Sequence, residues 1–209
     1  MLVNLSNRLT LTRIVLTAVF VMALLLPAEG VVQSVFPCGK SIALIVFVIA
    51  SLTDWWDGRI ARQRKQETSF GALLDPVADK ILTTAAFICF IEQKDYRCAP
   101  LVQAWMVLLI VAREFTVTGL RLVAREQGVV LKVDQHGKQK TASQMVAIIL
   151  VLIGLAARED WHSLGFNSGR FDQVFSIVVF WVMLLTVVLT TLSGIAYLYK
   201  NRKLFLQYA

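Results

Sequence analysis

Residues 174–199 read VFSIVVFWVMLLTVVLTTLSGIAYLY, a stretch without a charged residue. A helix needs about 20 predominantly apolar residues to cross the hydrocarbon core of a bilayer, and this stretch is longer than that. Its apolar residues do not alternate with polar ones, as they would in the spanning strands of a closed barrel. The stretch therefore predicts a transmembrane helix.

Other long apolar stretches precede it, at residues 9–27, 41–57, 76–93, 100–124 and 142–158. The chain of 209 residues is 57% hydrophobic and 17% charged, and its mean hydropathy is +0.66. A water-soluble domain of this size would not have that balance. We therefore expect an all-α polytopic membrane protein with six transmembrane helices. No repeat or long linker divides the chain, so residues 1–209 should form a single domain.

The basic residues indicate how these helices are oriented. Of the 21 Lys and Arg residues, the ones expected on the side away from both termini are Lys40, Lys94, Arg97, Arg158 and Arg170. All others fall on the side of the termini, and cytoplasmic loops carry the excess of Lys and Arg. Both termini should therefore be cytoplasmic. We attribute the net charge of +7 to this bias and to anionic lipid head groups, and we expect no nucleic-acid partner.

The three cysteines show no spacing typical of a metal site. Cys89 falls inside an expected span and should fill the core. Cys38 and Cys98 fall in the two expected non-cytoplasmic loops, where a disulfide bond between them is an open alternative.

Four aspartates lie close to the second and third expected spans: Asp54, Asp57, Asp75 and Asp79. The first two are three residues apart and the last two are four apart, so each pair shares one face if its segment is helical. Carboxylates at membrane depth usually face a bundle interior or an aqueous pocket. Four of them together would repel one another unless a multivalent cation bound there. Oxygen ligands without His or Cys favour Mg²⁺ or Mn²⁺.

Small residues and an arginine accompany these aspartates. Gly58, Ala61 and Gly71 leave room for a nucleotide against the helices, and Arg62 could bind its phosphates. Each position also has a structural explanation, because small residues let helices pack closely and Asp75, which precedes a proline, could cap a helix. The positions taken together favour a binding site.

The spacing of these eight residues resembles the full signature of the CDP-alcohol phosphotransferase family, and in this chain it reads Asp54-x2-Asp57-Gly58-x2-Ala61-Arg62-x8-Gly71-x3-Asp75-x3-Asp79. The resemblance implies six transmembrane helices, a homodimer, and two divalent cations, Mg²⁺ or Mn²⁺, held by the four aspartates. It also implies that Asp79 is the general base that takes the proton of the alcohol. The implied contacts with the CDP group are Asp54, Gly58, Ala61, Arg62 and Gly71.

Further segments resemble the phosphatidylglycerophosphate synthases within that family: residues 7–13, Arg113-Glu114, residues 119–121 and residues 137–141. This resemblance implies transfer of a phosphatidyl group from CDP-diacylglycerol to sn-glycerol 3-phosphate, which gives phosphatidylglycerol phosphate and CMP. It also implies an integral protein of the bacterial inner membrane, in contact with membrane lipid, whose active site faces the cytoplasm.

An anionic acceptor needs cationic partners for its phosphate, and Arg113, Lys138 and Lys140 are the candidates. An alternative explanation is that both lysines are ordinary cytoplasmic charges. Arg113 lies inside the fourth expected span, where pairing with Glu114 could also satisfy it.

Two other functions stay open. The same chemistry could act on another acceptor, such as phosphatidylglycerol, serine or an inositol phosphate, although a neutral acceptor would not require the three cations. A divalent cation transporter is a more remote alternative, because transport predicts acidic positions on both halves of the pathway, whereas these aspartates lie near one face.

Overall fold

The computed structural model describes residues 5–25, 38–64, 69–126, 136–163 and 169–202. Within these ranges, the side chains of residues 5–10, 54–64, 69–79, 125–126, 136–140 and 160–163 lie outside the description. The described residues form six helices and no strand: α1 (Leu5–Leu25), α3 (Gly39–Arg64), α4 (Ser69–Glu92), α5 (Ala104–Glu126), α6 (His136–Ser163) and α7 (Gly169–Lys200). The all-α prediction is confirmed.

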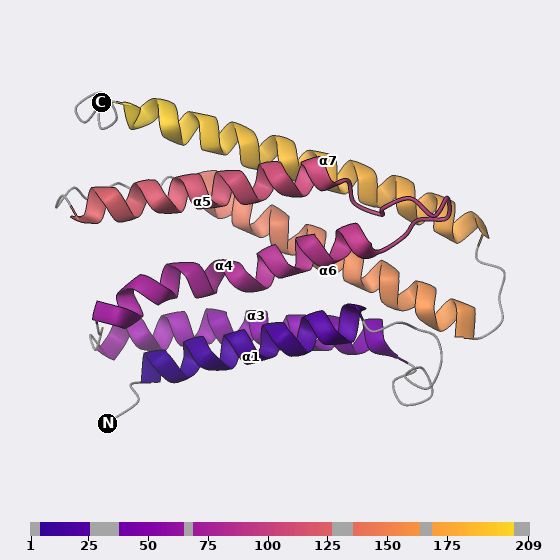
Figure 1. Ribbon diagram of the computed structural model, residues 1–209, viewed down its shortest axis with the longest axis horizontal. Helices are drawn as coiled ribbons and strands as arrows, with labels where there is room; N and C mark the ends of the chain where they lie inside the picture. Colours follow the sequence, from indigo (N-terminus) through magenta and orange to yellow (C-terminus); the bar gives the residue numbers. More distant parts are fainter. Residues whose placement is uncertain (1–4, 26–37, 65–68, 127–135, 164–168, 203–209) are drawn as a thin grey trace.

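Successive helices run in opposite directions along the long axis of the molecule (Figure 1). As a result, α1, α4 and α6 begin at the end of the bundle where α3, α5 and α7 finish. We call this the terminal end, because the first helix begins there and the last one finishes there, and we call the opposite end the far end. This alternation is the arrangement that the order of apolar stretches predicts.

Several helices extend beyond the apolar stretches, and α3 and α4 do so by the most at the terminal end. Helix α3 continues to Arg64 and α4 begins at Ser69, so both extend beyond their apolar parts at the terminal end. The alternative in which Asp75 caps a helix is wrong, because Asp75 lies inside α4. The extra turns of α3 are mostly polar and carry no hydropathy signal, whereas the extra turns of α4 precede Asp75-Pro76, a pair typical of a helix start.

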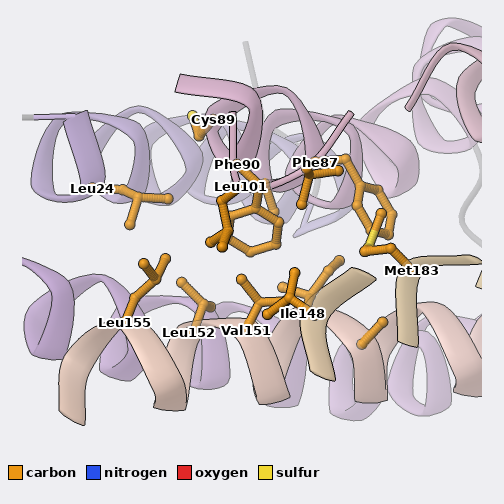
Figure 2. Packing of buried hydrophobic residues seen from close by; sticks show 14 of the residues in the cluster. Leu24, Phe87, Cys89, Phe90, Leu101, Ile148, Val151, Leu152, Leu155 and Met183 are labelled. Atoms are coloured by element: carbon orange, nitrogen blue, oxygen red, sulfur yellow. The ribbon is translucent and has the colours of Figure 1, made fainter. Parts of the chain in front are cut away.

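Helix α6 packs at the centre of the bundle, against α3, α4 and α7. Figure 2 shows its apolar stripe of Ile148, Val151, Leu152 and Leu155, which faces side chains of α1, α4 and α7. The spacing of three and four residues places this stripe on one face of the helix. On the opposite side of the core, the large buried side chains include Leu24, Phe87, Phe90 and Met183. In lipid, such close packing holds helices together without the hydrophobic effect.

The outer surface of the bundle is strongly apolar. Leu108, Trp181 and Leu192 are each exposed over 60% or more of their surface, and soluble monomers rarely expose large apolar patches. Thr141–Glu159 in α6 and all of α7 are long and apolar enough to cross a membrane. Shorter apolar segments occur in α1 and α3, at Leu11–Leu25 and Gly39–Thr53. These features indicate a membrane protein.

An ion pair and two hydrogen bonds join the helices at the far end of the bundle. Arg158 Nε lies 3.1 Å from Asp172 Oδ1, and Arg158 Nη1 donates to the carbonyl of Lys94 at 2.6 Å. The backbone N–H of Lys40 donates to Glu159 Oε2 at 2.9 Å. These contacts join α3, α6, α7 and the connection between α4 and α5.

The cysteines lie partly as the sequence suggested. Cys89 is buried in the core, as expected, whereas Cys38 and Cys98 are exposed free thiols near the far end. The open alternative of a disulfide bond between them is not realised in the structure.

Candidate active site

The four aspartates lie on two helices that are consecutive in the chain. Asp54 and Asp57 are near the end of α3, and Asp75 and Asp79 are in the first half of α4. Both segments are helical, so the condition for each pair to share a helix face is met. Both also approach the terminal end of the bundle (Figure 1).

The side chains of these aspartates lie outside the described residues, and so do those of the expected CDP contacts. Gly58, Ala61 and Arg62 belong to the same segment of α3, and Gly71 belongs to the first turn of α4. Among the side chains that the structure describes, no three His, Cys, Asp or Glu residues gather as they would around a metal ion. The donor chemistry of the aspartates fits Mg²⁺ or Mn²⁺, because all four offer hard carboxylate oxygens.

The described side chains next to this segment form a buried polar cluster around Glu114 of α5. Lys80 Nζ on α4 donates to Glu114 Oε2 at 2.5 Å, and Gln144 Nε2 on α6 donates to Oε1 at 3.2 Å. Arg113 Nη1 lies 3.3 Å from the same Oε1. We call these four residues together with Ser193 the Glu114 cluster. Glu114 is only 5% exposed, and a buried carboxylate is tolerated when it is paired in this way.

Arg113 is held between Glu114 and α7. Its Nη2 donates to Ser193 Oγ at 3.1 Å. A Cβ atom at Gly194 would lie 2.7 Å from Arg113 Cγ, so the glycine provides the space through which the arginine side chain passes. Arg113 Nε is buried and has no acceptor among the described residues.

Arg121 continues the row of cations toward the terminal end. Its Nε lies 3.4 Å from the hydroxyl oxygen of Tyr197, and its guanidinium group stacks over the ring at 5.3 Å from the centroid. Glu114 and Arg121 are seven residues apart, so they share one face of α5. Lys80 and Arg113 contact the carboxylate of Glu114, and Arg121 adds a third positive charge two turns further along α5.

Of the three predicted acceptor contacts, the structure describes Arg113 in full. Lys138 and Lys140 lie in the first turns of α6, and their side chains are outside the described residues. Lys140 is one turn before Gln144, a member of the Glu114 cluster. The pairing of Arg113 with Glu114, which the sequence analysis considered as an alternative, is confirmed.

Sequence reasoning missed the roles of Lys80, Gln144 and Ser193. A signal existed for the first two, because a polar residue within an apolar stretch usually faces the bundle interior. Ser193 offered no comparable signal, since the last apolar stretch also contains several other hydroxyl residues.

Comparison with known proteins supplies the family. The family model of CDP-alcohol phosphatidyltransferases matches residues 3–193. This chain belongs to that family. The match spans both aspartate pairs, the Glu114 cluster and the start of α6, so the proposed site residues of this phosphatidyltransferase lie within the shared region.

Three curated relatives share the name CDP-diacylglycerol–glycerol-3-phosphate 3-phosphatidyltransferase. The phosphatidyltransferase is 39% identical to the one from Bacillus subtilis over 202 residues, which cover 95% of each chain. It is 33% identical to the one from Rickettsia bellii, with 97% of each chain covered. A relative from Yersinia enterocolitica is 36% identical over 88% of this chain and 92% of its own. No solved structure matches the chain.

Proposed function

We propose that this phosphatidyltransferase transfers the phosphatidyl group of CDP-diacylglycerol to sn-glycerol 3-phosphate, giving phosphatidylglycerol phosphate and CMP. The observation that carries the choice of acceptor is the surplus of cations around Glu114. Lys80 and Arg113 meet there, directly beside the helical segment that carries Asp79. The names of relatives that cover nearly the whole chain support the same acceptor.

For the metal site, we propose that Asp54, Asp57, Asp75 and Asp79 hold two divalent cations, Mg²⁺ or Mn²⁺. When bound, such ions supply positive charge that stabilises the pyrophosphate of the donor and the departing CMP. Gly58, Ala61 and Gly71 would leave space for the CDP group, and Arg62 and Asp54 would contact it.

Asp79 is the proposed general base. The hydroxyl oxygen of the acceptor forms a bond to the phosphorus atom that bears diacylglycerol, while the bond from that phosphorus to the CMP oxygen breaks. The hydroxyl proton passes to the Asp79 carboxylate, and CMP leaves with the bonding electron pair. The site contributes by holding the attacking oxygen in line with the leaving group.

Arg113, Lys138 and Lys140 are the proposed partners of the acceptor phosphate. An arginine has five N–H donors, and described residues accept hydrogen bonds from two of those on Arg113. The arginine therefore keeps donors for a phosphate without releasing Glu114 or Ser193. Lys140 lies one helical turn from Gln144, so its backbone position is close to the same cluster.

The location follows from the same proposal. All six helices would cross the bacterial inner membrane in contact with its lipids, with the termini and the active site on the cytoplasmic side, and the protein would work as a homodimer. The alternating helix directions and the apolar outer surface support the spans, and the distribution of basic residues supports the orientation. Family membership favours a transferase over a cation transporter.

The identity of the acceptor can be tested with the purified protein in detergent. CDP-diacylglycerol would be offered with glycerol 3-phosphate, glycerol, serine, phosphatidylglycerol or an inositol phosphate, while CMP release and the lipid product are measured. We expect phosphatidylglycerol phosphate from glycerol 3-phosphate and little product from the others. Faster turnover of another acceptor would refute the proposed acceptor while leaving the transferase chemistry intact.

A further inference from the structure

The proposed acceptor pocket does not explain why the negatively charged Glu114 lies within it. The pocket is meant to bind an anion, yet a buried carboxylate lies among its cations. By Coulomb's law this negative charge weakens the attraction of the pocket for a phosphate. A pocket selected for affinity alone would bind phosphate more tightly without this carboxylate. The presence of Glu114 therefore needs another explanation.

The contacts of Glu114 supply one, because they join three helices at one carboxylate. Lys80 comes from α4, Gln144 from α6, and Arg113 from α5 itself, with donor–acceptor distances of 2.5, 3.2 and 3.3 Å. Hydrogen bonds to a buried charged group are costly to break, since the charge would then be left unpaired. The contacts therefore hold α4, α5 and α6 together at this level.

The same contacts lie between the two functional parts of the site. Lys80 follows Asp79 directly in α4, and consecutive Cα atoms are about 3.8 Å apart. Arg113 is held on one side by Glu114 and on the other by Ser193, and Gly194 leaves only enough space for its side chain. Glu114 thus connects the backbone that carries the general base to the guanidinium group that would bind the acceptor phosphate.

We propose that Glu114 is a positioning residue that sets the orientation of the acceptor relative to Asp79 rather than its affinity. The proposal rests on the function proposed above. Its physical basis is that an acceptor held at its phosphate end by Arg113 presents its hydroxyl correctly only if the distance between Arg113 and α4 is constant. A misplacement of about 1 Å can lower a rate on the order of 10²-fold.

The test is Glu114→Gln, which keeps the size of the side chain and removes its charge. We expect kcat to fall about ten- to hundredfold, while the KM for glycerol 3-phosphate stays constant or decreases, because the pocket becomes more positive. The KM for CDP-diacylglycerol should not change. Calorimetric titration of the variant with glycerol 3-phosphate should show affinity equal to or greater than that of the original protein.

A second variant keeps the proposal testable if Glu114→Gln does not fold. Gln144→Met removes one donor to Glu114 and keeps the ion pairs with Lys80 and Arg113, so it should show the same change in kcat with a smaller magnitude. Asp172→Asn and Glu159→Gln are matched controls, because they remove paired carboxylates at the far end of the bundle. They should lower the thermal midpoint without changing kcat or either KM.

Two results would overturn the proposal. One is a raised acceptor KM with unchanged kcat in Glu114→Gln, which would make Glu114 a support for binding alone. The other is equal kinetic effects of Glu114→Gln and the far-end variants, which would make its role purely structural. Failure of the proposed function is recognised separately, since the unsubstituted protein would then prefer another acceptor.

Discussion

Lys80 of α4 and Glu114 of α5 are 34 residues apart in the chain, and their side chains meet at 2.5 Å in the interior of the bundle. The contact joins the helix that carries Asp75 and Asp79 to the helix that carries Arg113. Lys80 follows Asp79 directly in the chain, so the cationic cluster begins next to the aspartate segment of α4. Substitutions in the aspartate segment and in the cationic cluster should impair the enzyme in different ways.

Divalent cations should be required for activity. The four aspartates offer only oxygen ligands and would repel one another without a cation, so excess chelator should abolish CMP release. Mg²⁺ or Mn²⁺ added back should restore it, with the rate measured as a function of free metal concentration. Full activity in excess chelator would contradict the proposed metal site.

Asp57→Asn and Asp79→Asn should differ in their effects. The first removes a proposed metal ligand, so it should weaken metal-dependent binding of CDP-diacylglycerol as well as turnover. The second removes the proposed base, so turnover should fall by about 10²–10⁴-fold while the donor still binds. Donor binding and kcat, measured on both variants, test the assignment, and equal loss of binding in both would show that Asp79 acts chiefly as a ligand.

The helices could be predicted from the sequence because each contains an apolar stretch of nearly membrane length. The ends of α3 and α4 could not, since residues 58–64 are a mostly polar continuation without a hydropathy signal. Residues 69–75 precede Asp75-Pro76, a pair typical of a helix start, although α4 already includes them. Those turns carry part of the aspartate signature. The spacing of the aspartates therefore predicted a metal site, although the ends of the two helices could not be predicted.

The Glu114 cluster was only partly predictable. Arg113 and Glu114 are adjacent in sequence, so their pairing could be considered from the sequence alone. Lys80 and Gln144 lie 34 and 30 residues from Glu114, and one sequence does not specify which helices pack at which height. Ser193 comes from a stretch without a recognised motif, and only the packing of α7 on α5 brings it to Arg113.

The orientation of the bundle can be tested with its cysteines. Cys38 and Cys98 are exposed near the far end, whereas Cys89 is buried. A membrane-impermeant maleimide should label the first two from the non-cytoplasmic side of oriented vesicles, and Cys89 should stay unlabelled until the protein is denatured. Labelling of Cys38 and Cys98 only from the cytoplasmic side would reverse the proposed topology.

Arg113→Gln and Lys140→Gln should weaken binding of the acceptor without weakening binding of the donor. Each removes a charged donor proposed to bind the phosphate, and such a hydrogen bond contributes about 1.5–3 kcal/mol, or roughly a ten- to hundredfold increase in acceptor KM. Saturation curves for both substrates measure this. Lys200→Gln is a matched control, because it removes a positive charge at the same end of the bundle but from the last turn of α7. An unchanged acceptor KM in both site variants would reject this pocket.

Gly194→Ala tests the same pocket without removing a charge. The added Cβ would lie 2.7 Å from Cγ and 3.3 Å from Nε of Arg113, so the arginine side chain has to shift. Overpacking of this kind costs about 1–3 kcal/mol, and we expect the displaced guanidinium group to raise the acceptor KM by about tenfold at constant donor KM.

Gly119→Ala is the control for the alanine substitution itself, because a Cβ at this position of α5 would meet no atom within 4 Å. Alanine favours a helix over glycine by about 1 kcal/mol, so this variant should keep both KM values and raise the thermal midpoint slightly. The two variants make the same chemical change on neighbouring helices, and they differ in whether the new methyl group touches Arg113. If both left the acceptor KM unchanged, the position of Arg113 against α7 would not matter for acceptor binding, and the phosphate contact would have to be assigned to other cations.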